Sequence, residues 1–168
     1  MALDLEAIEL IKQLKSRYFR GIDTANMEAL AQCMAPDVSA HFFGGSYEIK
    51  VEGFDEVMGF LKQSFHADAA ASHFGHTPEI TVDGDTATGL WYLYDIFYDL
   101  AREVKTSGSA VYEDTYIKTQ DGWKIKTTGY KRIWERVEPF KDDGRFTARR
   151  LGETGFKVEG LEPFPLPE

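Results

Sequence analysis

The stretch HFGHTPEITVDGDTATGLWYLYDIFY, residues 73–98, decides the fold that we predict for this chain. It is rich in β-branched and aromatic residues, and an Asp-Gly-Asp turn at residues 83–85 divides it. This composition predicts two strands, His73–Val82 and Thr86–Tyr98, paired as a hairpin. We therefore expect a fold built around long antiparallel strands.

Similar patterns extend the predicted sheet in both directions from this hairpin. Towards the C-terminus, strands Thr106–Thr119 and Trp123–Val137 flank a second tight turn, Asp-Gly. The charged residues 99–105 before them form either a longer loop or a bulged hairpin. Towards the N-terminus, Val38–Phe43 and Tyr47–Val51 flank Gly-Gly-Ser and predict another hairpin.

Three helices are predicted in the N-terminal half of the chain. Apolar residues recur at three- and four-residue steps from Leu5 to Ile22, and basic residues such as Lys15 fall off this stripe. A second helix is expected over residues 26–34, before a proline, and a third over Phe54–Phe65. Helices followed by antiparallel strands indicate an α+β fold. A curved sheet with helices on one face would leave a concavity where ligands bind.

Composition limits the possible partners. The chain has 168 residues, 43% of them hydrophobic, and a formal net charge of -9. We therefore expect one folded domain that binds neither nucleic acid nor anionic membranes. No apolar run is long enough to span a bilayer, the N-terminus lacks the basic start of a signal peptide, and the single Cys33 cannot form an internal disulfide. These features predict a cytoplasmic protein in which Cys33 is a buried structural thiol.

The C-terminal segment differs in composition from the rest. We expect residues 1–137 to form the domain and residues 138–168 to form an arm, because the latter are rich in proline, glycine and charge. Such a segment is expected to be extended and to pack on its own subunit or on a neighbouring one.

The candidate chemical groups begin with His73 and His76. A histidine titrates near neutral pH and so suits proton transfer. Because neighbouring side chains in a strand alternate between faces, the two histidines should point opposite ways. This disfavours a shared metal ion and favours one histidine in a pocket.

Asp95 is the next candidate, because it lies in an apolar strand, where a carboxylate is costly to bury without a partner. It shares a face of that strand with Trp91 and Phe97, a composition typical of a pocket wall.

Tyr18 and Asp23 complete the candidate set. The hydroxyl of Tyr18, on the apolar stripe, needs a partner if it is buried. On a continuous helix Asp23 would point about 140° away from Tyr18. Both face one cavity only if the helix ends near Gly21 or Asp23 lies in the turn, and spacing alone favours Asp23 as a helix N-cap. A His–Asp pair is a general-base device, and a phenol can stabilise a developing enolate. No cofactor motif accompanies these residues, so neither a cofactor nor a metal is expected.

These residues, in this order, resemble the SnoaL-like branch of the nuclear transport factor 2-like superfamily, of the bile-acid 7α-dehydratase and scytalone dehydratase type. The similarity spans residues 5–137. The segments that carry it are Lys15–Asp23, Ser72–Ile80, Ala87–Asp95, Tyr112–Tyr116, Trp123–Lys126 and Thr128–Tyr130.

The resemblance implies a cone-shaped fold in which three helices pack into a strongly bent sheet around a deep pocket. It implies that His73 is the base, oriented by Asp23, and that Tyr18 donates a hydrogen bond to the substrate carbonyl. Asp95 would assist departure of a β-hydroxyl, either as an acid or through water. His76 is expected to be either structural or in the second shell of the site. We expect substrate-binding walls at His41, Phe43, Trp91 and Val111.

The leading functional hypothesis is a cofactor-free hydro-lyase acting on a bulky hydroxy-carbonyl compound, steroid-like or polyketide-like and aromatic. A non-catalytic binding module or structural subunit is the alternative from another class, because the same fold serves both. A ketosteroid-type isomerase and a dehydrochlorinase share the proton abstraction. The resemblance also implies a homo-oligomer, dimer or trimer, formed through the convex face of the sheet, and Tyr92 and Tyr94, expected on that face, agree with it.

Overall fold

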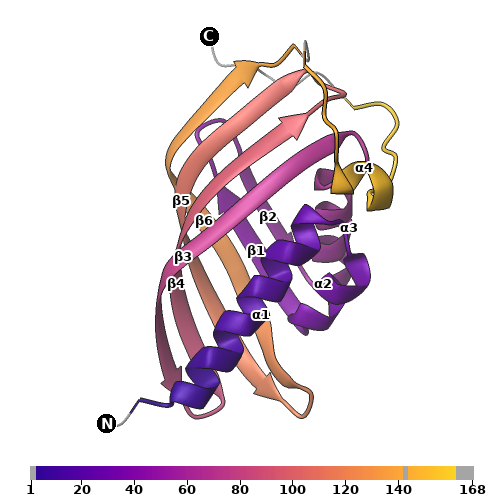
Figure 1. Cartoon of the computed structure of the whole chain (residues 1–168). Helices are drawn as coiled ribbons and strands as arrows, with labels where there is room; N and C mark the ends of the chain where they lie inside the picture. The colour runs from indigo at the N-terminus through magenta and orange to yellow at the C-terminus, as the bar shows by residue number, and fades with distance from the viewer. Residues whose placement is uncertain (1–2, 142–143, 162–168) are drawn as a thin grey trace.

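A computed structural model describes residues 3–141 and 144–161 as a curved sheet with helices on its concave side (Figure 1). The long strands bend around the three N-terminal helices. Within these residues no helix combines the length and apolar character needed to cross a bilayer. In chain order the elements are α1 (Leu5–Asp23), α2 (Met27–Cys33), β1 (Met34–Phe43), β2 (Glu48–Glu52), α3 (Phe54–Ser64), β3 (Ala69–Asp83), β4 (Thr86–Asp99), β5 (Val104–Thr119), β6 (Gly122–Pro139) and α4 (Arg150–Thr154).

The described strands form one six-stranded sheet in the order β2-β1-β6-β5-β4-β3. Neighbouring strands pair antiparallel except β1 and β6, which are parallel. The chain therefore crosses from the β1–β2 hairpin at one edge to β3 at the other and returns by successive hairpins. The predicted α+β class with a curved, mostly antiparallel sheet is confirmed.

Two strands begin four residues earlier than predicted. β1 starts at Met34 and includes Pro36. The proline is tolerated because the pairing of β1 with β6 shifts register between residues 34 and 39, so its missing N–H falls in an unpaired stretch. β3 starts at Ala69 and contains the Thr77-Pro78 step, where the register with β4 shifts and Thr77 has φ 43°. The proline lies in this bulge and does not end the strand.

The end of α1 corrects the prediction that Asp23 is an N-cap. Asp23 is the last residue of α1, and Asn26 caps α2 by accepting a hydrogen bond from the N–H of Ala29 at 3.0 Å. Gly21 does not stop the helix. A β-carbon at this position would lie 2.8 Å from the side chain of Leu30, so the glycine allows α1 and α2 to pack closely.

A buried ion pair ties α1 to the sheet. Lys15 is fully buried, contrary to the prediction from the apolar stripe, and its Nζ lies 2.7 Å from Asp114 Oδ2 on β5. Asp114 also accepts hydrogen bonds from the hydroxyls of Thr128 and Tyr116, both at 2.7 Å. Burial lowers the pKa of Lys15, and the Asp114 carboxylate opposes this effect. A lysine is found in this apolar layer because β5 supplies its countercharge.

The described part of the C-terminal segment packs on its own chain. Leu151 of α4 is buried, and the guanidinium of Arg149 donates a hydrogen bond to the carbonyl of Ala67 at 2.7 Å. The hydroxyl of Thr154 donates to the carbonyl of Thr24, next to the end of α1. The sheet itself continues to Pro139, two residues beyond the predicted boundary. Residues 142–143 and 162–168 of the expected arm lie outside the described residues.

We predict that Lys15→Met lowers the free energy of unfolding by about 3–5 kcal/mol, because it leaves the Asp114 carboxylate buried without its cation. The double variant Lys15→Met/Asp114→Asn should lose less than the sum of the two single variants, because the two groups are coupled. Urea denaturation followed by circular dichroism measures both. Arg20→Met, an exposed basic residue on the same helix, is the control and should change stability by at most about 0.5 kcal/mol. Additive losses would contradict the assigned pairing.

Candidate active site

A cavity of about 280 Å³ lies between the N-terminal helices and the concave face of the sheet. Most of its wall is aromatic or aliphatic, which is typical of small-molecule sites with a few convergent polar groups. The ionisable side chains in the wall come from Tyr18, Tyr47, His73, Asp95, Arg102, Tyr112, Tyr130 and Arg132. The cavity therefore collects three of the four predicted catalytic residues, with Asp23 immediately behind His73.

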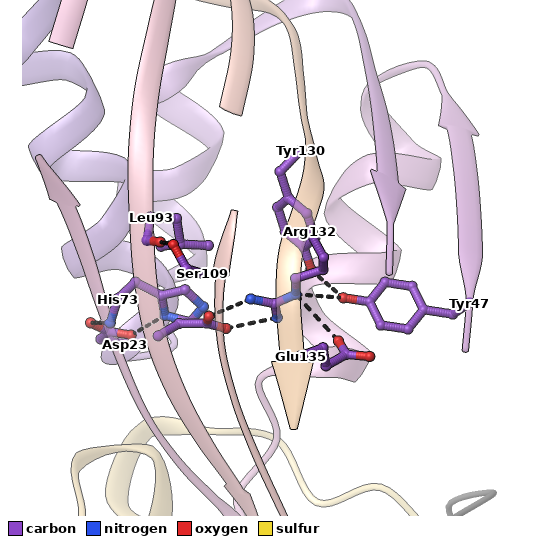
Figure 2. Close-up of polar contacts among 9 residues, drawn as sticks. Asp23, Tyr47, His73, Leu93, Ser109, Tyr130, Arg132 and Glu135 are labelled. Carbon is purple, nitrogen blue, oxygen red and sulfur yellow. Dashed lines mark hydrogen bonds and ion pairs between the residues drawn. The ribbon is translucent and has the colours of Figure 1, made fainter. Parts of the chain in front are cut away.

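His73 and Asp23 form a close pair across α1 and β3. The imidazole Nδ1 lies 2.6 Å from Asp23 Oδ1, and the backbone N–H of His73 donates to Asp23 Oδ2 at 3.0 Å. Because an ionised carboxylate only accepts hydrogen bonds, this geometry places a proton on Nδ1 and leaves Nε2 with a lone pair. Figure 2 shows the two side chains side by side. Both carboxylate oxygens of Asp23 are thus used to fix one histidine.

Aromatic rings hold the imidazole in place. Phe19 of α1 stacks on His73 with ring centroids 6.4 Å apart, and Phe65 meets it edge-on at 5.5 Å. Gly75, two residues further along β3, makes room for this arrangement, because a β-carbon there would lie 2.1 Å from the Phe19 ring. The glycine between the two histidines therefore serves the packing of the catalytic candidate.

Asp95 and Arg132 form a second buried pair within the cavity wall. Both guanidinium nitrogens of the arginine fork donate to the two oxygens of Asp95, one of them at 2.9 Å. The remaining Nε lies 3.2 Å from Glu135 Oε1. Burial, the largest single effect, lowers the pKa of Arg132, but the hydrogen bonds to Asp95 together with the charge interactions with Asp95 and the neighbouring tyrosines raise it above the usual value. In the register of the sheet Asp95 is the direct cross-strand neighbour of His73.

Four phenols complete the polar wall. The hydroxyls of Tyr47 and Tyr130 are 2.6 Å apart, and the ring of Tyr130 meets that of Tyr112 edge-on at 5.2 Å. Tyr18 lies edge-on to Tyr112 at 6.5 Å. Burial raises the pKa of each of these four tyrosines, so they are phenols and not phenolates at neutral pH.

The predicted substrate-binding walls are wrong. Phe43 and His41 are exposed at the outer side of β1, where the His41 imidazole lies 3.0 Å from Glu48 Oε1, and Val111 does not belong to the cavity wall. Trp91 does face inward, as alternation predicted, but its indole N–H donates to the Tyr116 hydroxyl at 2.9 Å in the buried layer of Asp114. Strand alternation predicts which face of the sheet a side chain lies on, but not whether its position along the strand is level with the cavity.

His76 lies on the opposite face of β3 from His73, so the two cannot share a metal ion. It is exposed, stacks on Tyr92 with centroids 5.7 Å apart, and does not contact the His73–Asp23 pair. Its expected place in the second shell of the site is therefore wrong. No group of three or more potential metal-ligating side chains occurs among residues 3–141 and 144–161.

Sequence reasoning missed Arg132 and Tyr47. The available signal for Arg132 was Asp95 itself, because a carboxylate in an apolar strand requires a cationic or hydrogen-bonding partner. Basic residues occur on more than one strand, so the partner of Asp95 could be chosen only once the pairing of β4, β5 and β6 was known. Tyr47 was visible only as the first residue after the Gly-Gly-Ser turn, and nothing local to it indicated a cavity.

Comparison with known proteins identifies the family and the fold. The model of a family described as SnoaL-like domain matches residues 3–129. A structure from Novosphingobium aromaticivorans, provisionally named an aromatic ring hydroxylase, is 17% identical, with a TM-score of 0.73 over 82% of this chain and 96% of that chain. Another from the same organism, provisionally named a scytalone dehydratase, is 19% identical, with a TM-score of 0.68 over 85% and 97%. Hexachlorocyclohexane dehydrochlorinase LinA-type3 from Novosphingobium barchaimii is 15% identical, with a TM-score of 0.65 over 97% of each chain. At these identities the likenesses show a shared fold.

We predict that Gly75→Ala lowers the free energy of unfolding by about 1–3 kcal/mol, because the added methyl group must displace the ring of Phe19. Thermal and urea denaturation measure the loss, and the displaced ring should also shift the NMR resonances of His73. Gly59→Ala is the matched control. Its β-carbon would meet nothing within 4 Å on α3, so stability should stay the same or rise by up to about 1 kcal/mol. An unchanged Gly75→Ala protein would contradict the packing role.

Proposed function

The chain belongs to the family of SnoaL-like domains, and from this premise we propose that it is a cofactor-free dehydratase. The reaction proposed is removal of a proton next to a carbonyl, followed by elimination of a β-hydroxyl as water. The observation that carries the proposal is the orientation of His73, whose Nδ1 is held by Asp23 while its Nε2 is left for the cavity. A base in an apolar cavity with polar groups on the facing wall is suited to this chemistry.

The proton-abstraction step follows from the pair. Nε2 takes the proton from the carbon next to the carbonyl, and the Asp23 carboxylate stabilises the imidazolium that forms. Negative charge then develops on the carbonyl oxygen. Tyr18, which lines the cavity five residues before Asp23, is proposed to donate a hydrogen bond to that oxygen. Water is kept from this step by the rings of Phe19 and Phe65 around the imidazole.

The position of Asp95 narrows its proposed role. An acid must carry a proton on one oxygen, whereas each oxygen of Asp95 accepts a hydrogen bond from Arg132. We therefore assign Asp95 to orienting Arg132 beside the base. The guanidinium so placed presents positive charge at the side of the cavity from which the hydroxyl would leave.

The cavity favours a compact substrate with aromatic character. Its volume of about 280 Å³ is close to the lower end of the range for ligand pockets, roughly 300–1,000 Å³. Phe42, Phe60 and Phe97 supply flat apolar surfaces in its wall. Of the two expected substrate classes, an aromatic or polyketide-like hydroxy-carbonyl compound fits this volume better than a four-ring steroid skeleton.

The names of the fold relatives agree with elimination chemistry. The substrate of a dehydratase loses water, and the substrate of a dehydrochlorinase loses hydrogen chloride. In each reaction a base removes a proton beside the carbon that bears the leaving group. An isomerase of the ketosteroid type would use the same base without a leaving group. The Arg132 cluster favours elimination, because isomerisation requires no cation at a departing oxygen.

We predict that His73→Ala lowers turnover by at least about 100-fold while the fold stays intact, because a general base contributes about 10²–10⁴-fold in rate. Mass spectrometry in deuterated buffer with a panel of aromatic β-hydroxy ketones measures both water loss and deuterium uptake. His76→Ala, on the outer face, is the control and should keep full activity.

Three results would contradict this proposal in different ways. Full activity of a folded His73→Ala protein would exclude the assigned base. Deuterium uptake without loss of water would replace the dehydratase by an isomerase. No reaction by the unmodified protein on any member of the panel would favour a binding module.

We also propose that the protein forms a homo-oligomer through the outer face of the sheet. Phe74, Tyr94 and Trp134 are exposed there on β3, β4 and β6, and their rings form a continuous patch with centroid distances of 6.5 Å and 6.3 Å. Contiguous apolar patches of this kind mark association surfaces. Because the protein has a net charge of -9, an exposed apolar face differs from the acidic character of the chain as a whole.

We predict that Tyr94→Glu/Trp134→Glu shifts the protein to a monomer in sedimentation-velocity experiments, because it places charge in the centre of the patch. The single variant Leu3→Glu, remote on the N-terminal segment, is the control and should leave the sedimentation coefficient unchanged. A wild-type protein that sediments as a monomer at micromolar concentration would overturn this proposal.

A further inference from the structure

We infer that Tyr47, hydrogen-bonded to Tyr130, is the acid that protonates the departing hydroxyl. The inference rests on the proposed dehydratase function and supplies the proton donor which that function requires. Tyr47 lies at the end of the β1–β2 turn, far in sequence from Tyr18, His73 and Arg132.

The position of Tyr47 satisfies the geometric requirement for this role. Its side chain and that of Tyr130 both line the cavity that contains His73, and their hydroxyls are 2.6 Å apart. In Figure 2 the Arg132 guanidinium lies between His73 on one side and Tyr47 on the other. Base and acid thus approach the cavity from different sides, so each can reach a different carbon of the substrate.

Arg132 makes this phenol a better acid when it is needed. Burial raises the pKa of Tyr47, and the neighbouring Arg132 charge opposes this effect. The hydroxyl is therefore protonated at neutral pH and available to donate. The Arg132 Nε donates to the Tyr47 oxygen at 3.4 Å, so the phenolate left behind after donation has a cation beside it.

Several other polar groups near the base already have roles or partners. Asp95 accepts at both oxygens from Arg132, and His73 must be unprotonated at Nε2 to act as the base. Tyr18 is assigned to the carbonyl oxygen. Glu135 lies 3.2 Å from Arg132 Nε on the far side of the guanidinium and does not belong to the wall of this cavity.

The proposed step balances in protons and electrons. His73 Nε2 takes the α-proton, the C–H electrons form the C=C bond, and the C–O bond breaks with its electrons on oxygen. Tyr47 transfers its hydroxyl proton to that oxygen, and the products are the unsaturated ketone and water. The imidazolium then loses its proton to solvent, and the Tyr47 phenolate takes one up, either directly or through the Tyr130 hydroxyl.

Leaving-group dependence tests this assignment. A β-hydroxy ketone and the β-chloro compound with the same carbon skeleton are given to the wild type and to Tyr47→Phe, and kcat is corrected for the uncatalysed reaction. Chloride leaves without being protonated, whereas the hydroxyl group needs a proton to leave as water. We predict that Tyr47→Phe loses about 10²–10⁴-fold in kcat on the hydroxy substrate and less than about tenfold on the chloro substrate. His73→Ala should lose activity on both.

Tyr98→Phe is the matched control, because it removes a phenol hydroxyl on β4 that is outside the cavity, and its kcat should not change. Tyr130→Phe should give a smaller loss than Tyr47→Phe with the same preference for chloride. Equal losses of Tyr47→Phe on both substrates, or no loss on either, would overturn the acid assignment while leaving the dehydratase intact. A wild type that eliminates neither leaving group would overturn the proposed function and this inference with it.

Discussion

The constraint on which the site depends is that a carboxylate buried in an apolar fold needs a partner from another element. Two buried carboxylates, Asp114 and Asp95, meet it, and Asp23, whose side chain is 24% exposed, is paired in the same way. Asp114 on β5 pairs with Lys15 of α1, Asp95 on β4 pairs with Arg132 of β6, and Asp23 at the end of α1 pairs with His73 of β3. Each pair joins elements distant in sequence, so the same interactions that neutralise buried charge also fix α1 against the sheet and β4 against β6. Only the last two pairs reach the cavity, and these are the ones to which we assign chemistry.

The fold could be predicted from sequence because its signals are local. The apolar period of α1, the turns Asp-Gly-Asp and Asp-Gly, and the aromatic alternation of β4 each depend on residues that are neighbours in the chain. The predicted start of β1 failed at Pro36, because a proline that normally interrupts a strand here lies in a bulge. A bulge depends on how a strand pairs, and that pairing is not visible within the strand itself.

The site was predictable only in part, for the same reason. His73, Asp95 and Tyr18 face the cavity as their alternation and helical spacing indicated, whereas Trp91 has the correct face but lies in the Tyr116–Asp114 layer. Arg132 was missed because its importance comes entirely from Asp95, two strands away in the sheet. Asp23 shows the limit most clearly, since its spacing favoured an N-cap, while its actual partners, the ring and backbone of His73, lie 50 residues further along the chain.

The arrangement also allows the proposed acid and the proposed base to coexist in one small cavity. If His73 and the acid lay in direct contact, a proton would pass between them and neither would be in the form that elimination requires. Here the Asp95–Arg132 pair lies between the two, and each half of that pair favours the state needed on its own side. Asp95, beside His73 in the register of the sheet, places negative charge where the imidazolium forms, and Arg132, beside Tyr47, places positive charge where a phenolate would form. The buried Asp95–Arg132 pair thus separates the two proton-transfer groups. It also places beside each group a charge opposite in sign to the charge that this group develops. The fully enclosed Lys15–Asp114 pair cannot have this function, because no substrate reaches it.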